Sequence, residues 1–148
     1  MLRIFLFFGI GAVLLSTGCA APLTVTQSER RARLAAYTYP ADAEIGPDLD
    51  VVVRREGETV IFVNRTASVY RDVQVWLNQQ YVRDLPGIAI GTDNRFTLTR
   101  WVNEHREPFP VGSLLSPDKA DPLLLAELYD PRTRLRHRLL AWPDTTGR

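Results

Sequence analysis

Alternating hydrophobic and polar positions run from Asp48 to Trp142. The segments Leu49–Arg55 and Glu58–Asn64 are rich in β-branched residues and are separated by the turn Glu56-Gly57, a pattern typical of neighbouring strands. In the second segment, apolar side chains occupy both sets of alternating positions. We therefore expect Glu58–Asn64 to form a strand that is at least partly covered on both faces.

The next segment, Val69–Leu77, alternates with a period of two. Its apolar face consists of Val69, Val73, Val75 and Leu77, interrupted by Arg71, and its other face of Tyr70, Asp72, Gln74 and Trp76. Asn78-Gln79 predicts a tight hairpin turn into a strand over Gln80–Leu85, because Asn tolerates positive φ. Pro86 and Gly87 are expected to end that strand.

The C-terminal half predicts three more strands. Arg95–Val102 is the first, and Asn103–Asp121, with three prolines and a glycine, is expected to be a long loop. Leu123–Tyr129 and Arg134–Trp142 then flank Asp130–Thr133, which has proline at the second turn position. This spacing predicts an antiparallel hairpin.

Before the strands, residues 19–47 predict a tether with one short helix. Thr26 and Glu29 have the spacing of a capping box, and Glu29–Tyr37 contains mainly helix-forming residues without a wide apolar stripe. Such a helix needs packing to persist. Pro40, Gly46 and Pro47 interrupt regular structure before the strands begin.

About seven strands at regular spacing indicate an all-β domain, a sandwich or a partly open barrel. Thr59–Asn64 followed by Tyr70–Asn78 (TVIFVN and YRDVQVWLN) resembles the immunoglobulin-like β-sandwich domains of exported bacterial proteins. The resemblance implies an immunoglobulin-like β-sandwich of about seven antiparallel strands over residues 48–143. Residues 144–148 are expected to be a C-terminal tail.

The N-terminus has the order of a signal peptide over residues 1–18. Arg3 is followed by the apolar run Ile4–Leu15 and the small residues Ser16-Thr17-Gly18. The run is short for a membrane span, which needs about 20 apolar residues. An uncleaved anchor extending to Ala21 is the alternative.

Cys19 is the only cysteine of the chain, which excludes an internal disulfide. Ser16-Thr17-Gly18-Cys19 resembles the lipobox of bacterial lipoproteins, although Ser16 stands where that family usually has leucine. The resemblance implies cleavage between Gly18 and Cys19, and lipidation of Cys19. Ala20, in place of an aspartate that favours inner-membrane retention, implies an outer-membrane anchor facing the periplasm. An incidental cysteine in an ordinary signal is the alternative.

The charge count argues against a nucleic-acid partner. The chain has 18 basic and 17 acidic side chains, and removal of residues 1–18 removes Arg3 and leaves 17 of each. A neutral domain lacks the positive charge that binding to phosphate backbones requires. Arginine accounts for every basic residue except Lys119.

Two groups of residues are candidates for a binding surface. Arg134, Arg136 and Arg138 are spaced by two, which places them on one strand face as a row projecting into water. Such a row either binds anionic groups or is a solvated edge, and Glu127 or Asp130 is a potential ion-pair partner. The aromatic residues Tyr70, Trp76 and Tyr81 either form a platform for sugars or peptides or pack in the core.

No catalytic residue, metal ligand or cofactor is assigned from the sequence. The serines stand in no recognisable nucleophile motif, and Gly87–Gly91 lacks the Lys and Ser/Thr of a phosphate loop. His105 and His137 have no metal-site spacing and are expected to be surface side chains.

We therefore expect a non-catalytic, membrane-tethered lipoprotein that acts as an interaction or structural module in the cell envelope. Its partner would be an envelope protein, which an edge strand can bind by β-augmentation. The alternative is a lipoprotein that binds glycan or peptidoglycan through an aromatic surface. An enzyme is the least favoured class.

Overall fold

The computed structural model describes residues 25–113 and 116–142, and the signal peptide and Cys19 lie outside this part. The described residues are mostly β-structure with one α-helix, α1 (Gln27–Ala35), and a short 3-10 helix, η1 (Leu98–Arg100). The strands are β1 (Glu44–Ile45), β2 (Leu49–Glu56), β3 (Thr59–Asn64), β4 (Tyr70–Leu77), β5 (Tyr81–Ile88), β6 (Asn94–Thr97), β7 (Val111–Ser113), β8 (Ser116–Ala120), β9 (Ala126–Asp130) and β10 (Leu135–Ala141).

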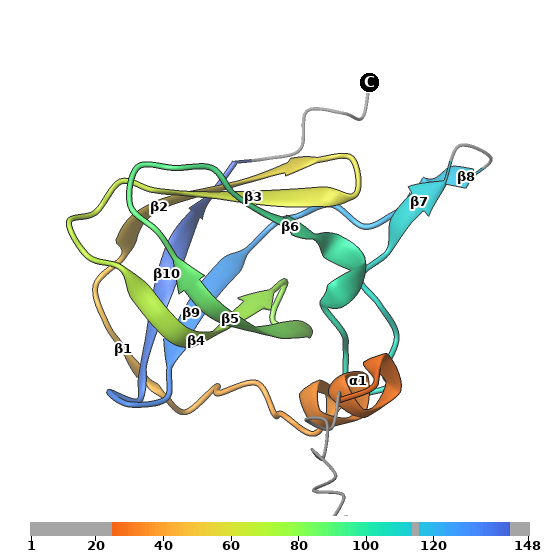
Figure 1. The fold of residues 1–148 in the computed structure, drawn as a ribbon, viewed down its shortest axis with the longest axis horizontal. Helices are drawn as coiled ribbons and strands as arrows, with labels where there is room; N and C mark the ends of the chain where they lie inside the picture. The colour runs from red at the N-terminus through yellow and green to blue at the C-terminus, as the bar shows by residue number, and fades with distance from the viewer. Residues whose placement is uncertain (1–24, 114–115, 143–148) are drawn as a thin grey trace, which may run out of the picture.

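One strongly curved sheet forms the body of the molecule, and the all-β prediction is confirmed (Figure 1). Its strand order is β5-β4-β9-β10-β2-β3-β6, with β1 pairing to β10. A bridge between Asn64 and Ile90 joins the end of β3 to the segment after β5. The sheet consequently curls into a nearly barrel-like shape.

The pairing of β10 differs from the expected antiparallel pattern. β10 runs antiparallel to β9 but parallel to both β1 and β2. A register shift between Leu139 and Leu140 accompanies its pairing with β2. The expectation of antiparallel strands throughout was therefore wrong at this strand, which joins the two halves of the curved sheet.

The main core lies inside the curve. Phe62, Val75 and Trp101 are fully buried there, and the ring planes of Phe62 and Trp101 are nearly parallel at a centroid distance of 6.2 Å. The Trp101 indole N–H donates to the carbonyl of Val75 at 3.1 Å. As expected for β3, side chains on both of its faces are buried, including Val60, Ile61 and Phe62.

A second apolar cluster lies under the segment that precedes β2. Leu34 of α1 packs with Trp76, Val82 and Val102, and Tyr37 and Tyr39 cover this cluster. The predicted helix and its capping box are confirmed, since Thr26 and Glu29 cap each other reciprocally. β1 also pairs with β10. Residues 26–45 thus form part of the folded unit, including much of the expected tether.

Three expected strand boundaries were wrong. Pro86 lies inside β5, where its missing N–H is tolerated because β5 is at the edge of the sheet. The strand expected over Arg95–Val102 is divided into β6 and η1. The expected loop Asn103–Asp121 contains β7 and β8, a hairpin that projects from the body (Figure 1).

The residues of two predicted turns adopt the backbone conformations and contacts that those turns require. Asn78 and Gln79 both have positive φ, as the tight turn between β4 and β5 requires. The hairpin of β9 and β10 is confirmed, and the Asp130 side chain accepts a hydrogen bond from the Arg132 amide inside its turn. No helix among residues 25–113 and 116–142 is long and apolar enough to cross a membrane.

Candidate functional site

A cavity of about 500 Å³ lies between α1, β5 and η1. Five arginines from these three elements line it: Arg30, Arg31, Arg33, Arg83 and Arg100. We refer to this cavity as the arginine pocket. Its location follows from the docking of α1, because Leu34 and Val82 anchor helix and strand in one apolar cluster.

The charges of the arginine pocket are not balanced locally. Asp84 is the one carboxylate among its lining residues, and Arg33 binds it at 3.2 Å. The Tyr37 hydroxyl donates to the same oxygen at 3.3 Å, and burial followed by the charge of Asp84 raises the pKa of Tyr37. Within residues 25–113 and 116–142, the other four arginines form no ion pair.

Arg83 is the cation of the pocket that stacks on aromatic rings. Its guanidinium carbon lies 4.8 Å from the centroid of the Trp101 ring and 5.0 Å from that of Phe96, within cation–π range. Burial, together with the nearby charges of Arg100 and Arg30, lowers the pKa of Arg83 to about 10. The side chain is therefore charged at neutral pH, although burial and the neighbouring arginines disfavour its charged form.

The Nη1 atom of Arg83 is buried and has no hydrogen-bond partner within the described residues. A buried donor without an acceptor typically costs about 1–3 kcal/mol. The aromatic rings fix the plane of the guanidinium but offer no strong acceptor. The rings thus hold the guanidinium plane of Arg83 at the wall of the pocket, although the buried Nη1 atom itself is not open to the cavity.

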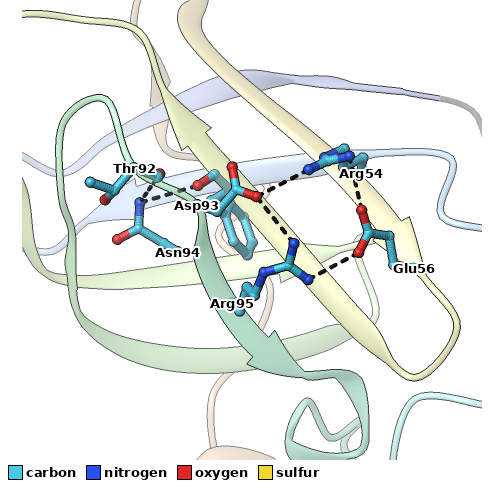
Figure 2. Close-up of polar contacts among 7 residues, drawn as sticks. Arg54, Glu56, Thr92, Asp93, Asn94 and Arg95 are labelled. Carbon is cyan, nitrogen blue, oxygen red and sulfur yellow. Dashed lines mark hydrogen bonds and ion pairs between the residues drawn. The ribbon is translucent and has the colours of Figure 1, made fainter.

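In a second arginine cluster, carboxylates balance the arginine charges (Figure 2). Arg54 binds Glu56 at 2.9 Å and Asp93 at 3.1 Å, and Arg95 binds the same two carboxylates at 3.0 and 3.2 Å. We call these four side chains the charge ring. The Asn94 amide donates to the carbonyls of Phe62, Ala89 and Thr92, which fixes the loop that presents Asp93.

The charge ring is complete without a ligand. Arg54, Ile61 and Arg95 lie at the same register across β2, β3 and β6, and Ile61 is fully buried. The ring therefore belongs to the sheet near its β6 edge, where charged side chains discourage edge-to-edge aggregation. Its four side chains are 41–52% exposed, so solvent and salt screen its ion pairs.

The predicted arginine row does not form as expected. Arg134 has a φ of +60° and lies in the turn before β10, and Arg138 is exposed on the strand. Arg136, however, is only 12% exposed and binds Glu127 at 2.9 Å, so it does not project into water. The expectation of a solvated row was wrong at Arg136, while the expected ion-pair role of Glu127 is confirmed.

Arg136 and Glu127 form a buried polar cluster with Tyr39. The Tyr39 hydroxyl donates to Glu127 at 2.6 Å, and the guanidinium of Arg136 lies over the Tyr39 ring and contacts its hydroxyl. Burial, with the hydrogen bond to Glu127 as the next cause, raises the pKa of Tyr39 to about 12. The cluster fastens the segment after α1 to β9 and β10.

The three candidate aromatic residues are divided between the two apolar clusters. Trp76 is 2% exposed and belongs to the cluster under α1, where it meets Tyr39 edge-on at 5.4 Å. Tyr81 is 7% exposed in the main core, and Tyr70 packs against that same core. The structure therefore does not bring these residues together as one exposed platform.

The histidines differ in their surroundings. His105 is exposed beside Glu104, whereas a ring nitrogen of His137 lies 2.8 Å from the carbonyl of Pro47, so His137 packs against the segment before β2. Within residues 25–113 and 116–142, no group of three or more His, Cys, Asp or Glu side chains is arranged to hold a metal ion.

No family model, no curated protein and no solved structure matches this chain. The arginine pocket was not found by sequence reasoning, although Arg30, Arg31 and Arg33 on one predicted helix were a visible signal. Arg83 and Arg100 gave no comparable signal, because they lie in separate segments and only the docking of α1 brings them to the same cavity as the helix arginines.

Proposed function

We propose that this chain is a non-catalytic, lipid-anchored binding module of the bacterial cell envelope, and that the arginine pocket is its binding site. The observation that supports this most directly is the unbalanced positive charge that lines the pocket. A cavity of about 500 Å³ has the size of small-molecule sites. Arginine suits recognition of acidic groups because its planar fork donates two parallel hydrogen bonds.

The position of the pocket along the chain fits an anchor at Cys19. α1 begins at Gln27, eight residues after Cys19, and a chain of that length reaches at most about 28 Å. A lipid on Cys19 would keep the pocket close to the bilayer. With the proposed outer-membrane location, the pocket would meet acidic ligands or partners at the periplasmic surface.

The proposal of a binding rather than a catalytic role rests on the lining side chains. Four of the five arginines lack a carboxylate, and Asp84 is engaged by Arg33 and Tyr37. Such a set recognises charge and offers no paired base and nucleophile. The glycan-binding alternative required an exposed aromatic face, and the burial of Trp76 and Tyr81 weighs against it.

We also propose that the sheet is a variant of the immunoglobulin-like sandwich. Two groups of adjacent strands support this, β4-β9-β10 and β2-β3-β6, which correspond in chain order to the C-F-G and A-B-E groups of that fold. The parallel pairing of β10 with β2 would then join the two halves at one edge.

The anchor is tested by substitution of Cys19. In the full chain expressed in a Gram-negative host, Cys19→Ala should abolish incorporation of labelled fatty acid and release the protein from the membrane fraction. Ala20→Asp is the matched control, because it should keep the label while shifting the protein towards the inner membrane. Tight membrane association of Cys19→Ala would contradict the proposal and indicate that the apolar run is the anchor.

A further inference from the structure

The arginine pocket has the chemistry of a site for one compact anion with several acceptor oxygens. Its arginines converge from a helix, a strand and a 3-10 helix, so their donors reach the cavity from different directions. A tetrahedral phosphoryl group presents several acceptor oxygens, and at neutral pH it carries about two negative charges in a monoester and one in a diester. A single carboxylate would satisfy only one guanidinium fork.

We infer that the arginine pocket binds a phosphoryl group, with Arg83 as the central donor and Arg30 and Arg100 as flanking cations. The inference deepens the proposed binding role and does not depend on the anchor at Cys19. Arg83 supplies the positioned cation, since its guanidinium stacks on Trp101 and Phe96 at the wall of the pocket.

The electrostatics of the pocket agree with this assignment. Arg100 and Arg30 both act on Arg83 as like charges, and the pKa of Arg83 is accordingly lowered to about 10 after the larger effect of burial. A phosphoryl group between these cations would reverse that opposition. Asp84 does not compete for Arg83, because it is bound by Arg33 and Tyr37.

The size of the cavity indicates the class of ligand. About 500 Å³ exceeds what a bare phosphate ion fills, which leaves room for a small organic group attached to it. A phosphate monoester or diester is therefore the expected ligand class. Such a group comes either from a soluble phosphorylated molecule or from a lipid headgroup, and the two sources are separable by experiment.

The test uses the full chain purified in a non-ionic detergent and titrated calorimetrically with glycerol 3-phosphate. We expect saturable binding, weakened about tenfold or more by Arg83→Gln and also weakened by Arg83→Lys, which keeps the charge but loses the planar fork. Arg100→Gln, at an exposed position, should weaken binding without affecting the fold. Arg138→Gln is the matched control at an exposed arginine outside the pocket and should leave the affinity within about twofold of wild type.

A second arm adds phosphatidylglycerol or phosphatidylcholine to the detergent micelles. Displacement of glycerol 3-phosphate by phosphatidylglycerol alone would assign the site to an anionic lipid headgroup. Lack of displacement would assign it to a soluble phosphate ester. The inference is overturned if neither the soluble ester nor the anionic lipid binds up to about 10 mM, or if Arg138→Gln weakens binding as much as Arg100→Gln. If wild type binds phosphate and Cys19→Ala stays in the membrane, the anchor proposal fails and this inference stands. If Cys19→Ala leaves the membrane but the wild-type chain binds no phosphate, this inference fails and the anchor proposal stands.

Discussion

The charge ring and the arginine pocket are both built from arginines, but they differ in whether carboxylates balance the arginine charges. In the ring, Arg54 and Arg95 share the carboxylates of Glu56 and Asp93, and each of the four side chains has two partners. In the pocket, five arginines surround a cavity with one carboxylate, Asp84. The ring is locally neutral and the pocket is locally positive, although Arg30, Arg33 and Arg100 are exposed just as the side chains of the ring are.

The difference shows that neutrality of a whole chain says little about its local charge. Residues 19–148 have 17 basic and 17 acidic side chains, so an excess of carboxylates elsewhere must offset the pocket. Screening restricts each charge to roughly one Debye length, about 8 Å at physiological salt. A ligand in the pocket would therefore meet the pocket's own positive charge and little of the balance elsewhere.

The largest expected effect comes from a third environment, the buried pair of Arg136 and Glu127, which sets the scale for the other two. Arg136→Gln should lower the free energy of unfolding by about 3 kcal/mol, because it leaves the Glu127 carboxylate buried without its cation. Urea unfolding measures the loss, and Arg138→Gln on the same strand should change stability by only a few tenths of a kcal/mol. A loss for Arg136→Gln as small as that of Arg138→Gln would mean that burial does not distinguish these arginines.

The same buried cluster predicts a loss of stability at alkaline pH. Because the pKa of Tyr39 rises from 10.0 to about 12 on folding, the folded state holds its proton more tightly than the unfolded state. The contribution of Tyr39 is fully present below pH 10 and is lost between pH 10 and about 12. Urea unfolding across this range should show a steeper decline in wild type than in Tyr39→Phe. Equal slopes for the two proteins would contradict the proposed environment of Tyr39.

Removal of the single carboxylate of the pocket should have opposite effects on stability and binding. Asp84→Asn should lower the free energy of unfolding by about 1 kcal/mol, because it breaks the ion pair with Arg33 and weakens the hydrogen bond from Tyr37. The same change makes the pocket more positive and should tighten glycerol 3-phosphate binding by about threefold, equivalent to about 0.7 kcal/mol. Weaker binding by Asp84→Asn would indicate that Asp84 helps to hold the ligand.

The smallest effect is expected in the charge ring. A double-mutant cycle of Arg54→Gln with Asp93→Asn should give a weak coupling in dilute buffer that disappears in about 1 M salt, because both side chains are more than 40% exposed. Neither change should alter phosphate binding. A coupling that persists in salt would show that these ion pairs contribute to stability as buried pairs do, which would contradict their description as a screened surface network.

Local chemistry made several parts of this fold predictable. Three local features depend only on neighbouring residues, so the sequence pattern was sufficient to place them. They are the capping box of Thr26 and Glu29, the positive φ values at Asn78 and Gln79, and the turn before β10. Glu127 was also named correctly as a partner for the arginines of β10, since the hairpin places it on their face of the sheet, opposite Arg138 and diagonal to Arg136, which it binds.

Long-range contacts account for what sequence reasoning missed. Pro86 was expected to end a strand, and it is tolerated only because β5 is an edge. The parallel pairing of β10 with β2 joins residues about 90 positions apart and has no local signature. The arginine pocket has the same origin, because Arg30, Arg83 and Arg100 meet only after α1 docks over Val82.

The most direct test of the contrast between ring and pocket is nuclear magnetic resonance of the arginine side chains in the ¹⁵N-labelled full chain. Addition of glycerol 3-phosphate should shift the Nε–H signals of Arg83 and Arg100 with a common saturation curve and leave those of Arg54 and Arg95 unchanged. Shifts of similar size at all four arginines, without saturation, would contradict the account, because they would mean that phosphate meets only a diffuse surface charge.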